Sequence, residues 1–121
     1  MDAIGFEFSR NLLEYGLRQA KSDLDITALA LMIIELTQSA QSDLVWEVAE
    51  RDLLKALIVR EIKTNKEPSL KNIRKLVASD DVETILKDEE VWKDLQKLSP
   101  DEHFPAMVNA GVAERMMAFE Y

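Results

Sequence analysis

The chain has 121 residues, of which 47% are hydrophobic and 31% are charged, and its net charge is −8. These values are typical of one globular domain and exclude an intrinsically disordered chain. The absence of cysteine excludes disulfides and thiolate metal sites and suits a reducing compartment. No apolar run approaches the length of about 18 residues that spans a bilayer. We therefore expect a single helical domain over residues 1–121, located in the cytoplasm.

The predicted architecture is all-α, a compact bundle of about six to seven helices. Only three glycines and three prolines are present, which is few for a chain built from strands and tight turns. The first predicted helix covers residues 3–20. Its expected inward-facing stripe consists of Ile4, Phe8, Leu12, Tyr15 and Leu17. The second covers residues 24–38 and begins at a capping box of Ser22 and Asp25. It is apolar nearly all round, which predicts a central position.

The third predicted helix begins at Ser42 or Asp43 and forms the main core helix. Residues at three- and four-residue spacings form its buried stripe, namely Trp46, Ala49, Leu53, Ala56, Leu57 and Arg60. We expect Trp46 to anchor the start of this helix, so that the bundle is organised around a central, tryptophan-led segment.

Four shorter helices are predicted in the second half of the chain. Ser69 caps a helix over residues 70–78, and the run from Asp80 to Glu83 resembles a second capping box. A helix near residues 88–98 should bury its apolar side chains, Val91, Trp92, Leu95 and Leu98. The run Ser99-Pro100-Asp101-Glu102 has the pattern of a helix start, and the last helix is expected over about residues 105–120, with Met107 among its inward-facing residues.

Patterns typical of catalysis are weak. Gly5, Gly16 and Gly111 are isolated, so no phosphate-binding loop is present. The only histidine, His103, has no nucleophile or metal ligand patterned around it. Adjacent acids in one helical turn point in different directions and do not converge as paired catalytic carboxylates must. We therefore expect no catalytic, cofactor-binding or metal-binding residues in this chain.

A basic stretch is the first candidate binding site. Residues 42–79 carry eight bases and six acids, whereas residues 80–121 carry four bases and eleven acids. The candidate DNA-contacting residues lie within the first segment: Arg60, Lys63, Lys66, Lys71, Arg74 and Lys75. Such a patch could hold phosphates despite the negative net charge. The alternative is an ordinary solvated surface whose lysines match the helix dipoles.

An acidic stretch is the second candidate. Residues 80–102 carry nine acids and three bases, which could attract a basic protein partner. The candidate partner-binding face consists of Asp88, Glu89, Glu90 and Asp94. A role in solubility alone would also explain these charges.

Three segments of the chain carry a family resemblance, namely SDLDITALALMIIELTQ (22–38), SDLVWEVAERDLLKALIVREI (42–62) and EPSLKNIRKLV (67–77). The first two resemble the type IV coupling proteins, which are ring-forming ATPases that feed DNA and relaxase into conjugative secretion channels, and the third is similar to the helix that follows them in the family. The matching residues are Asp25, Leu29, Ala30, Ile33, Ile34, Trp46, Ala49, Glu50, Leu53, Leu54, Ala56, Leu57 and Ile58. The resemblance covers residues 22–121, and residues 1–21 match poorly. Where the family often has Asp-Pro-Phe-Trp, this chain has Asp43-Leu44-Val45-Trp46.

The resemblance implies that the chain is the all-α domain of such a coupling ATPase, a helical insertion in its motor domain. It would recognise substrate without catalysing a reaction, docking a relaxase or accessory protein and contacting DNA weakly. The resemblance further implies a hexameric parent anchored in the cell membrane and facing the cytoplasm. The isolated domain is expected to be a monomer without cofactor or membrane contact. The alternative function is a free-standing helical adaptor or regulatory protein-binding domain.

Overall fold

A computed structural model describes residues 3–37, 43–87 and 89–119 of the chain. Within these residues the protein contains seven α-helices and one short 3-10 helix, and no strand, which confirms the all-α class. The elements are α1 (Ala3–Gln19), α2 (Asp23–Leu36), α3 (Leu44–Thr64), α4 (Leu70–Ala78), α5 (Val82–Leu86), α6 (Glu90–Leu98), α7 (Phe104–Met116) and η1 (Met117–Phe119).

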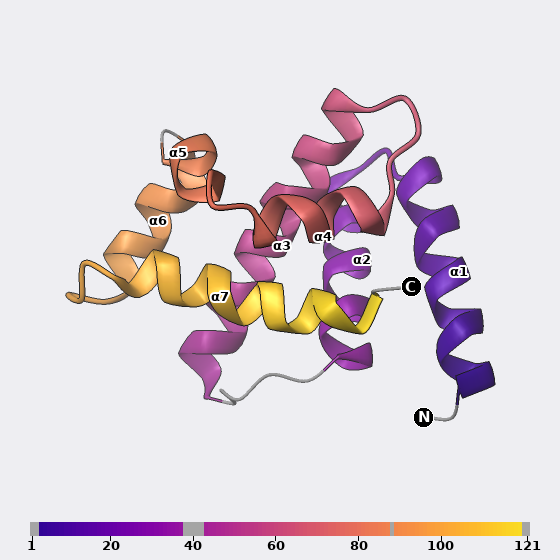
Figure 1. The fold of residues 1–121 in the computed structure, drawn as a ribbon, viewed down its shortest axis with the longest axis horizontal. Helices are drawn as coiled ribbons and strands as arrows, with labels where there is room; N and C mark the ends of the chain where they lie inside the picture. The colour runs from indigo at the N-terminus through magenta and orange to yellow at the C-terminus, as the bar shows by residue number, and fades with distance from the viewer. Residues whose placement is uncertain (1–2, 38–42, 88, 120–121) are drawn as a thin grey trace.

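The long helix α3 runs through the middle of the molecule and contacts α1, α2, α4, α6 and α7 (Figure 1). Helices α1 and α2 form an antiparallel pair at one end, with α1 outermost, and α5 and α6 lie at the other end. Helix α7 crosses from the α6 end towards α1, and η1 continues it. There the ring of Phe119 stacks on Phe6 of α1, with centroids 5.5 Å apart. The carboxyl-terminal part of the chain therefore ties the two ends together.

Three helix starts confirm the predicted caps. Ser22 accepts a hydrogen bond from the Asp25 amide, and the Asp25 carboxylate accepts one from the Ser22 amide, so the capping box is complete. Asp43 accepts from the Trp46 amide at 2.9 Å, and Ser69 accepts from the Asn72 amide at 3.1 Å. The alternative cap Ser42 lies outside the described residues. Capping side chains next to each helix thus set the starts of α2, α3 and α4.

Two other predicted caps are wrong, although α5 begins at Val82, directly after the predicted capping residues. Asp81 precedes α5 in a helical backbone conformation and makes no side-chain cap, because Ser79 instead accepts the Asp81 amide in a turn. Ser99 likewise accepts the Asp101 amide at 3.2 Å, and this turn ends before α7 begins at Phe104. In both cases a serine side chain accepts the amide two residues further on, and this local turn stands where a cap was predicted.

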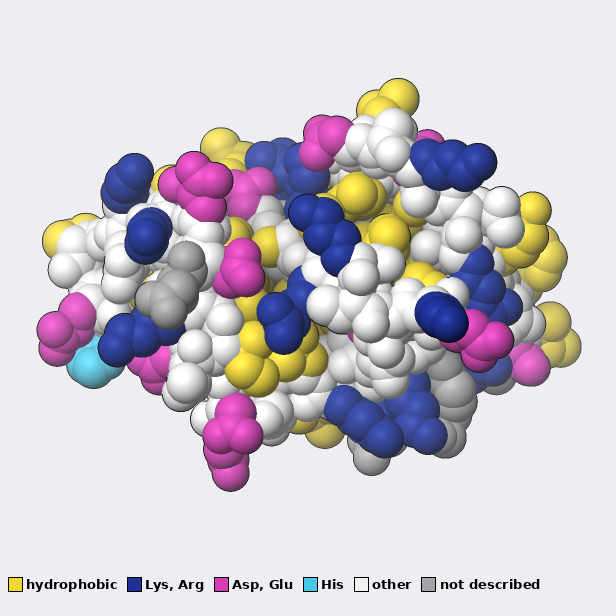
Figure 2. Space-filling model, turned by 90° about the horizontal axis from the view of Figure 1, so that it is seen from above, with side chains coloured by type: hydrophobic (Ala, Val, Ile, Leu, Met, Phe, Trp, Pro, Cys, Tyr) yellow, Lys and Arg dark blue, Asp and Glu magenta, His cyan; other side chains and the backbone are white. Residues whose placement is uncertain are grey.

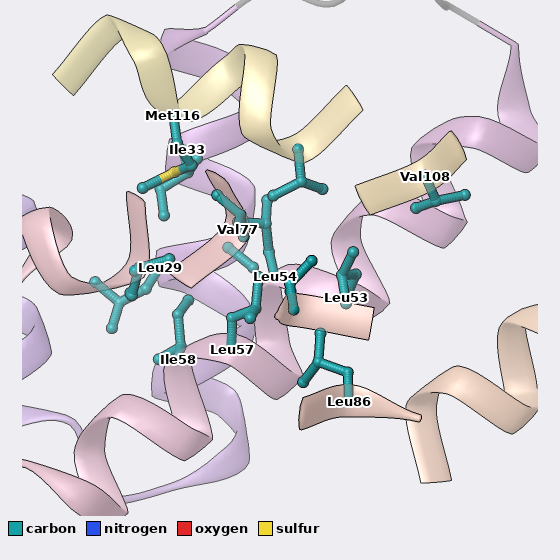
Figure 3. Close-up of a cluster of buried hydrophobic side chains, with 14 of the residues drawn as sticks. Leu29, Ile33, Leu53, Leu54, Leu57, Ile58, Val77, Leu86, Val108 and Met116 are labelled. Carbon is teal, nitrogen blue, oxygen red and sulfur yellow. The ribbon is translucent and has the colours of Figure 1, made fainter. Parts of the chain in front are cut away.

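The core is an aliphatic cluster drawn from most of the helices (Figure 3). Leu53, Leu54, Leu57 and Ile58 of α3 are wholly buried at its centre. The predicted central position of α2 is confirmed only in part, because α2 packs against both α1 and α3 and buries Leu29, Ala30 and Ile33 but leaves Leu24 and Leu31 exposed. Trp46 is only partly buried. Its ring lies 5.3 Å from that of Phe104, at the edge of the core rather than in its middle.

Several predicted inward-facing residues point to solvent. In α1 the buried residues are Leu13 and Leu17, whereas the rest of the predicted stripe is exposed: Ile4, Phe8, Leu12 and Tyr15. Leu98 and Met107 are also exposed, because they lie beyond or beside the faces that α6 and α7 pack inward. The α1 stripe leaves an apolar surface on the outside of the molecule.

Two buried carboxylates, which the sequence analysis did not identify, join distant helices. Glu50 of α3 is wholly buried and accepts a hydrogen bond from Arg115 of α7. Glu61 accepts hydrogen bonds from the Asn65 and Asn72 side chains and from the Ser69 amide, at 2.7 to 2.9 Å. It thereby holds the turn between α3 and α4. A hydrogen-bonded buried carboxylate of this kind serves the fold.

Candidate functional site

The predicted basic residues do not form one uniform surface. Lys63, Lys66, Lys71 and Lys75 are exposed, whereas Arg60 and Arg74 are partly buried. Arg60 and Lys63 belong to α3, Lys66 lies in the turn after it, and the others belong to α4. Figure 2 looks onto this side of the molecule, where dark blue side chains spread across the middle of the surface. The patch is therefore broad, and its residues have different surroundings.

A cleft of about 350 Å³ lies between the second half of α3 and the segment that joins α5 to α6. One wall carries Arg60, Lys63 and Thr64 from α3, and the other carries Glu89 and Glu90. Between them lies an apolar floor, which consists of Ala56, Val59, Leu86 and Val91. On the face seen in Figure 2, yellow apolar surface is visible between blue and magenta side chains. The cleft thus combines an apolar interior with one cationic and one anionic wall.

Arg60 and Glu89 face one another across this cleft. The Arg60 guanidinium lies 4.0 Å from Glu89 Oε1, and both side chains remain accessible to water. Glu89 is the residue before α6, yet its carboxylate makes no capping hydrogen bond to that helix. An accessible ion pair at this distance contributes little to stability. Breaking this ion pair therefore costs little free energy, so both charges are available to a partner protein.

A second groove, of about 230 Å³, lies on the other side of Arg60 between α3 and α4. Arg60 and Thr64 line both spaces, and Lys75 joins them in the second. The amino end of α4 beside this groove is already occupied: Ser69, Glu61 and Glu14 accept hydrogen bonds from the Asn72, Ser69 and Leu70 amides. A phosphate would find these amides taken and two carboxylates beside them, so α4 does not offer a helix-end phosphate site.

The residues of the predicted acidic face, like the basic residues, have different surroundings. Glu89 and Glu90 line the cleft, whereas Asp94 lies outside it and is 4.0 Å from Lys97 on the exposed side of α6. Asp88 lies outside the described residues. The sequence predicted these charges as two separate surfaces. The structure instead places Arg60 and Lys63 opposite Glu89 and Glu90 in a single cleft.

The apolar floor and Thr64 also belong to this site, although no sequence pattern predicts it. Ala56 and Val59 follow ordinary helical spacing on α3, and no local pattern distinguishes a cleft floor from a core position. Leu86 and Val91 reach the same cleft only because α5 and α6 fold back on α3. Tertiary packing, which leaves no local sequence signal, creates the site.

Residues 3–37, 43–87 and 89–119 contain little that is typical of a metal site or of a catalytic site. No cluster of three acidic or histidine side chains there could hold a metal ion. His103 is exposed and lies 3.5 Å from the exposed Glu102 carboxylate, in the turn before α7. No helix in the described part of the chain is long and apolar enough to cross a membrane.

Comparison of the chain with models of protein families, with curated proteins and with solved structures finds no match. The link to the coupling proteins therefore rests on the sequence motifs alone. The structure supplies a different kind of information, namely which motif residues lie inside the fold and which could reach a partner.

Proposed function

We propose that this chain is a non-catalytic docking domain of a type IV secretion coupling ATPase and that it binds a protein substrate, a relaxase or its accessory factor, in the cleft between α3 and α6. The observation that carries the docking role is the Arg60–Glu89 pair above an apolar floor. Weakly paired charges around apolar surface favour a protein partner with its own apolar anchor and charges of both signs.

The link to coupling proteins is supported by the structural roles of the motif residues. Most of the motif is buried, namely Leu29, Ala30, Ile33, Ala49, Glu50, Leu53, Leu54, Leu57 and Ile58. Asp25 completes the α2 capping box, and Glu50 pairs with Arg115. A motif made of such residues would be a signature of a shared fold, which is what the resemblance implies for an all-α domain.

Two finer points belong to this proposal. Trp46 would fix the start of α3 against α7 through its contact with Phe104. The exposed lysines, Lys63, Lys66, Lys71 and Lys75, would make secondary, salt-sensitive contacts with DNA. The net charge of −8 restricts DNA to this minor role.

The proposal is tested by binding of the chain to the relaxase encoded beside its gene. Charge reversal by Arg60→Glu should weaken capture, and so should Glu89→Arg. Asp94→Lys is the matched control, because Asp94 lies on the same helix as Glu90 but outside the cleft. Equal capture by all three variants would reject the cleft as the docking site.

The alternative function, a free-standing adaptor, predicts a different set of neighbouring coding regions. A docking domain of a coupling ATPase should be encoded together with a nucleotide-binding motor and a membrane anchor. A gene that encodes this helical region alone, with relaxase capture absent, would favour a free-standing adaptor. Turnover of nucleotide by the purified chain would contradict the non-catalytic role.

A further inference from the structure

Helix α1 has an apolar face on each side. One side packs inward through Leu13 and Leu17, which are 0% and 1% exposed. The opposite side carries Ile4, Phe8, Leu12 and Tyr15, which are 83%, 65%, 46% and 63% exposed. These four residues are spaced by four, four and three positions and so form one stripe along the helix. Packing of the inner face is enough to hold α1 in the fold, so the apolar residues of its outer face have no role within the monomer.

The stripe lies at the end of the molecule. Helix α1 is the outermost element in Figure 1, and yellow side chains gather at the same end in Figure 2. Two aromatic and two aliphatic side chains at these exposures offer about 400–600 Å² of apolar surface, which is the size of patch that marks an interaction site. Two such stripes in contact would bury about 1,000 Å² in total, the lower end of the range for specific association.

The charges beside the stripe select the orientation of a second copy. Glu7 lies near the amino end of the stripe and Arg18 near the carboxyl end, and both are exposed. Helical geometry places them on the same flank of the stripe, because eleven residues are close to three whole turns. In an antiparallel pair related by a two-fold axis, Glu7 of one copy lies beside Arg18 of the other, and the pair occurs twice. A parallel arrangement creates neither pair.

We propose that two copies of this chain associate through the outer faces of α1, as an antiparallel helix pair whose two-fold axis passes near Leu12. The face is self-complementary in both apolar surface and charge, as a two-fold interface must be. This inference concerns a different surface from the proposed docking cleft and does not depend on it. It departs from the sequence-based expectation that the isolated domain is a monomer.

The existing contacts of Glu7 and Arg18 do not oppose this pairing. Arg10, whose side chain is 22% exposed, lies 3.9 Å from the 67% exposed carboxylate of Glu7 one turn along the same helix, so the Glu7 charge remains accessible to a partner. Because the buried area is small, the dimer should dissociate on dilution. The association should therefore be weak, as expected for an interface at the lower end of the range for specific association.

Sedimentation equilibrium of the intact chain over a range of concentrations tests the association. The wild-type chain should approach twice its monomer mass at the highest concentrations, and Phe8→Glu should remain a monomer throughout. Because Phe8 is exposed, this substitution should leave the helical circular dichroism unchanged. Asp94→Lys, on the distant helix α6, serves as the control and should dimerise as the wild-type chain does.

Charge reversal tests the identity of the occupant. Glu7→Arg alone and Arg18→Glu alone should each weaken the dimer several-fold, because each places like charges together twice. The double variant Glu7→Arg/Arg18→Glu should recover the wild-type dissociation constant. Only a second copy of the same chain can restore complementarity in this way, because any other partner would still meet reversed charges.

Single cysteines test the orientation, since the chain has none of its own. Asn11→Cys lies close to the proposed axis and should be joined to its counterpart by a short bismaleimide cross-linker. Ile4→Cys lies near the end of the stripe, where the two copies of the residue are about 25 Å apart along the helix axes, and should not cross-link. A chain that stays monomeric at all concentrations would overturn the proposal, and so would cross-linking at Ile4 with none at Asn11.

Discussion

Arg115 of α7 donates a hydrogen bond to Glu50 of α3 in the interior of the protein. The same guanidinium donates to the backbone oxygens of Ile34 and Thr37, at 3.2 and 3.0 Å, where α2 ends. One side chain thus joins three helices and supplies donors to carbonyls that lack partners within α2. Glu50 lies beside Gly111, where a Cβ atom would be 3.6 Å from the carboxylate, an ordinary van der Waals contact.

Removing this arginine should be strongly destabilising. Arg115→Met should lower the free energy of unfolding by about 3–5 kcal/mol, because it leaves a buried carboxylate unpaired and removes donors from the end of α2. Urea denaturation measures the change. The matched control is Arg51→Met, since Arg51 forms an accessible pair with Asp52 and should change stability by less than about 0.5 kcal/mol. Similar losses in both variants would contradict this role of Arg115.

Glu61 should matter to the turn between α3 and α4. Glu61→Ala removes the acceptor of three hydrogen bonds from Asn65, Ser69 and Asn72. It should cost about 1–2 kcal/mol of unfolding free energy, because three donors in partly buried hydrogen bonds are left without this acceptor. Glu67→Ala, in the exposed part of the same turn, is the control and should be nearly neutral. Hydrogen exchange should locate the loss at the Ser69 amide, and unchanged protection there would count against the assignment.

The α2 capping box gives the stability a predictable pH dependence. Hydrogen bonds from the Lys21 and Ser22 amides hold the pKa of Asp25 below its ordinary value of 3.8. A lowered folded-state pKa means that this contribution is present above about pH 3.8 and is lost as the pH falls through the folded-state value. The stability difference between the wild-type chain and Asp25→Asn should therefore shrink below that pH. A difference that stays constant down to the acid unfolding transition would refute the linkage.

Trp46 should contribute through its contact with Phe104 rather than through full burial. Trp46→Ala should cost about 2–3 kcal/mol, less than a fully buried tryptophan, and Trp46→Phe should restore most of the loss because a ring remains. Thermal or urea unfolding measures both. If Trp46→Ala changes stability by no more than an exposed substitution such as Leu44→Ala, the proposed anchoring of α3 fails.

DNA contact should be weak and depend on lysine charge. Substituting the exposed residues Lys66, Lys71 and Lys75 with glutamate should abolish binding of a short duplex in fluorescence anisotropy, and affinity of the wild-type chain should fall steeply as salt is raised. Replacing Lys97, which lies on α6 with Asp94, is the control. Binding that survives the triple change, or that ignores salt, would rule out the basic patch as the contact.

The sequence predicted those parts of the fold that depend on residues close together in the chain. Capping by Ser22, Asp43 and Ser69 depends on residues three positions away, and the sequence predicted each of them, Asp43 as one of two candidates with Ser42. The inward face of α1 was not, because that helix is apolar on both sides and periodicity alone cannot choose between them. Glu50 gave no signal either, since its partner Arg115 is 65 positions away. Charged residues of the candidate site were identified individually, but their meeting in one cleft depends on how α5 and α6 pack on α3.

The central claim is tested most directly by the affinity of the chain for the relaxase encoded beside its gene. This affinity is compared between the wild-type chain, Arg60→Glu, Glu89→Arg and the double variant. The account predicts that each single variant binds at least about tenfold more weakly, the loss expected when one partner charge in a contact is reversed. Asp94→Lys should bind as the wild-type chain does. Wild-type affinity in both cleft variants, or no binding of relaxase or accessory protein by the wild-type chain, would contradict it.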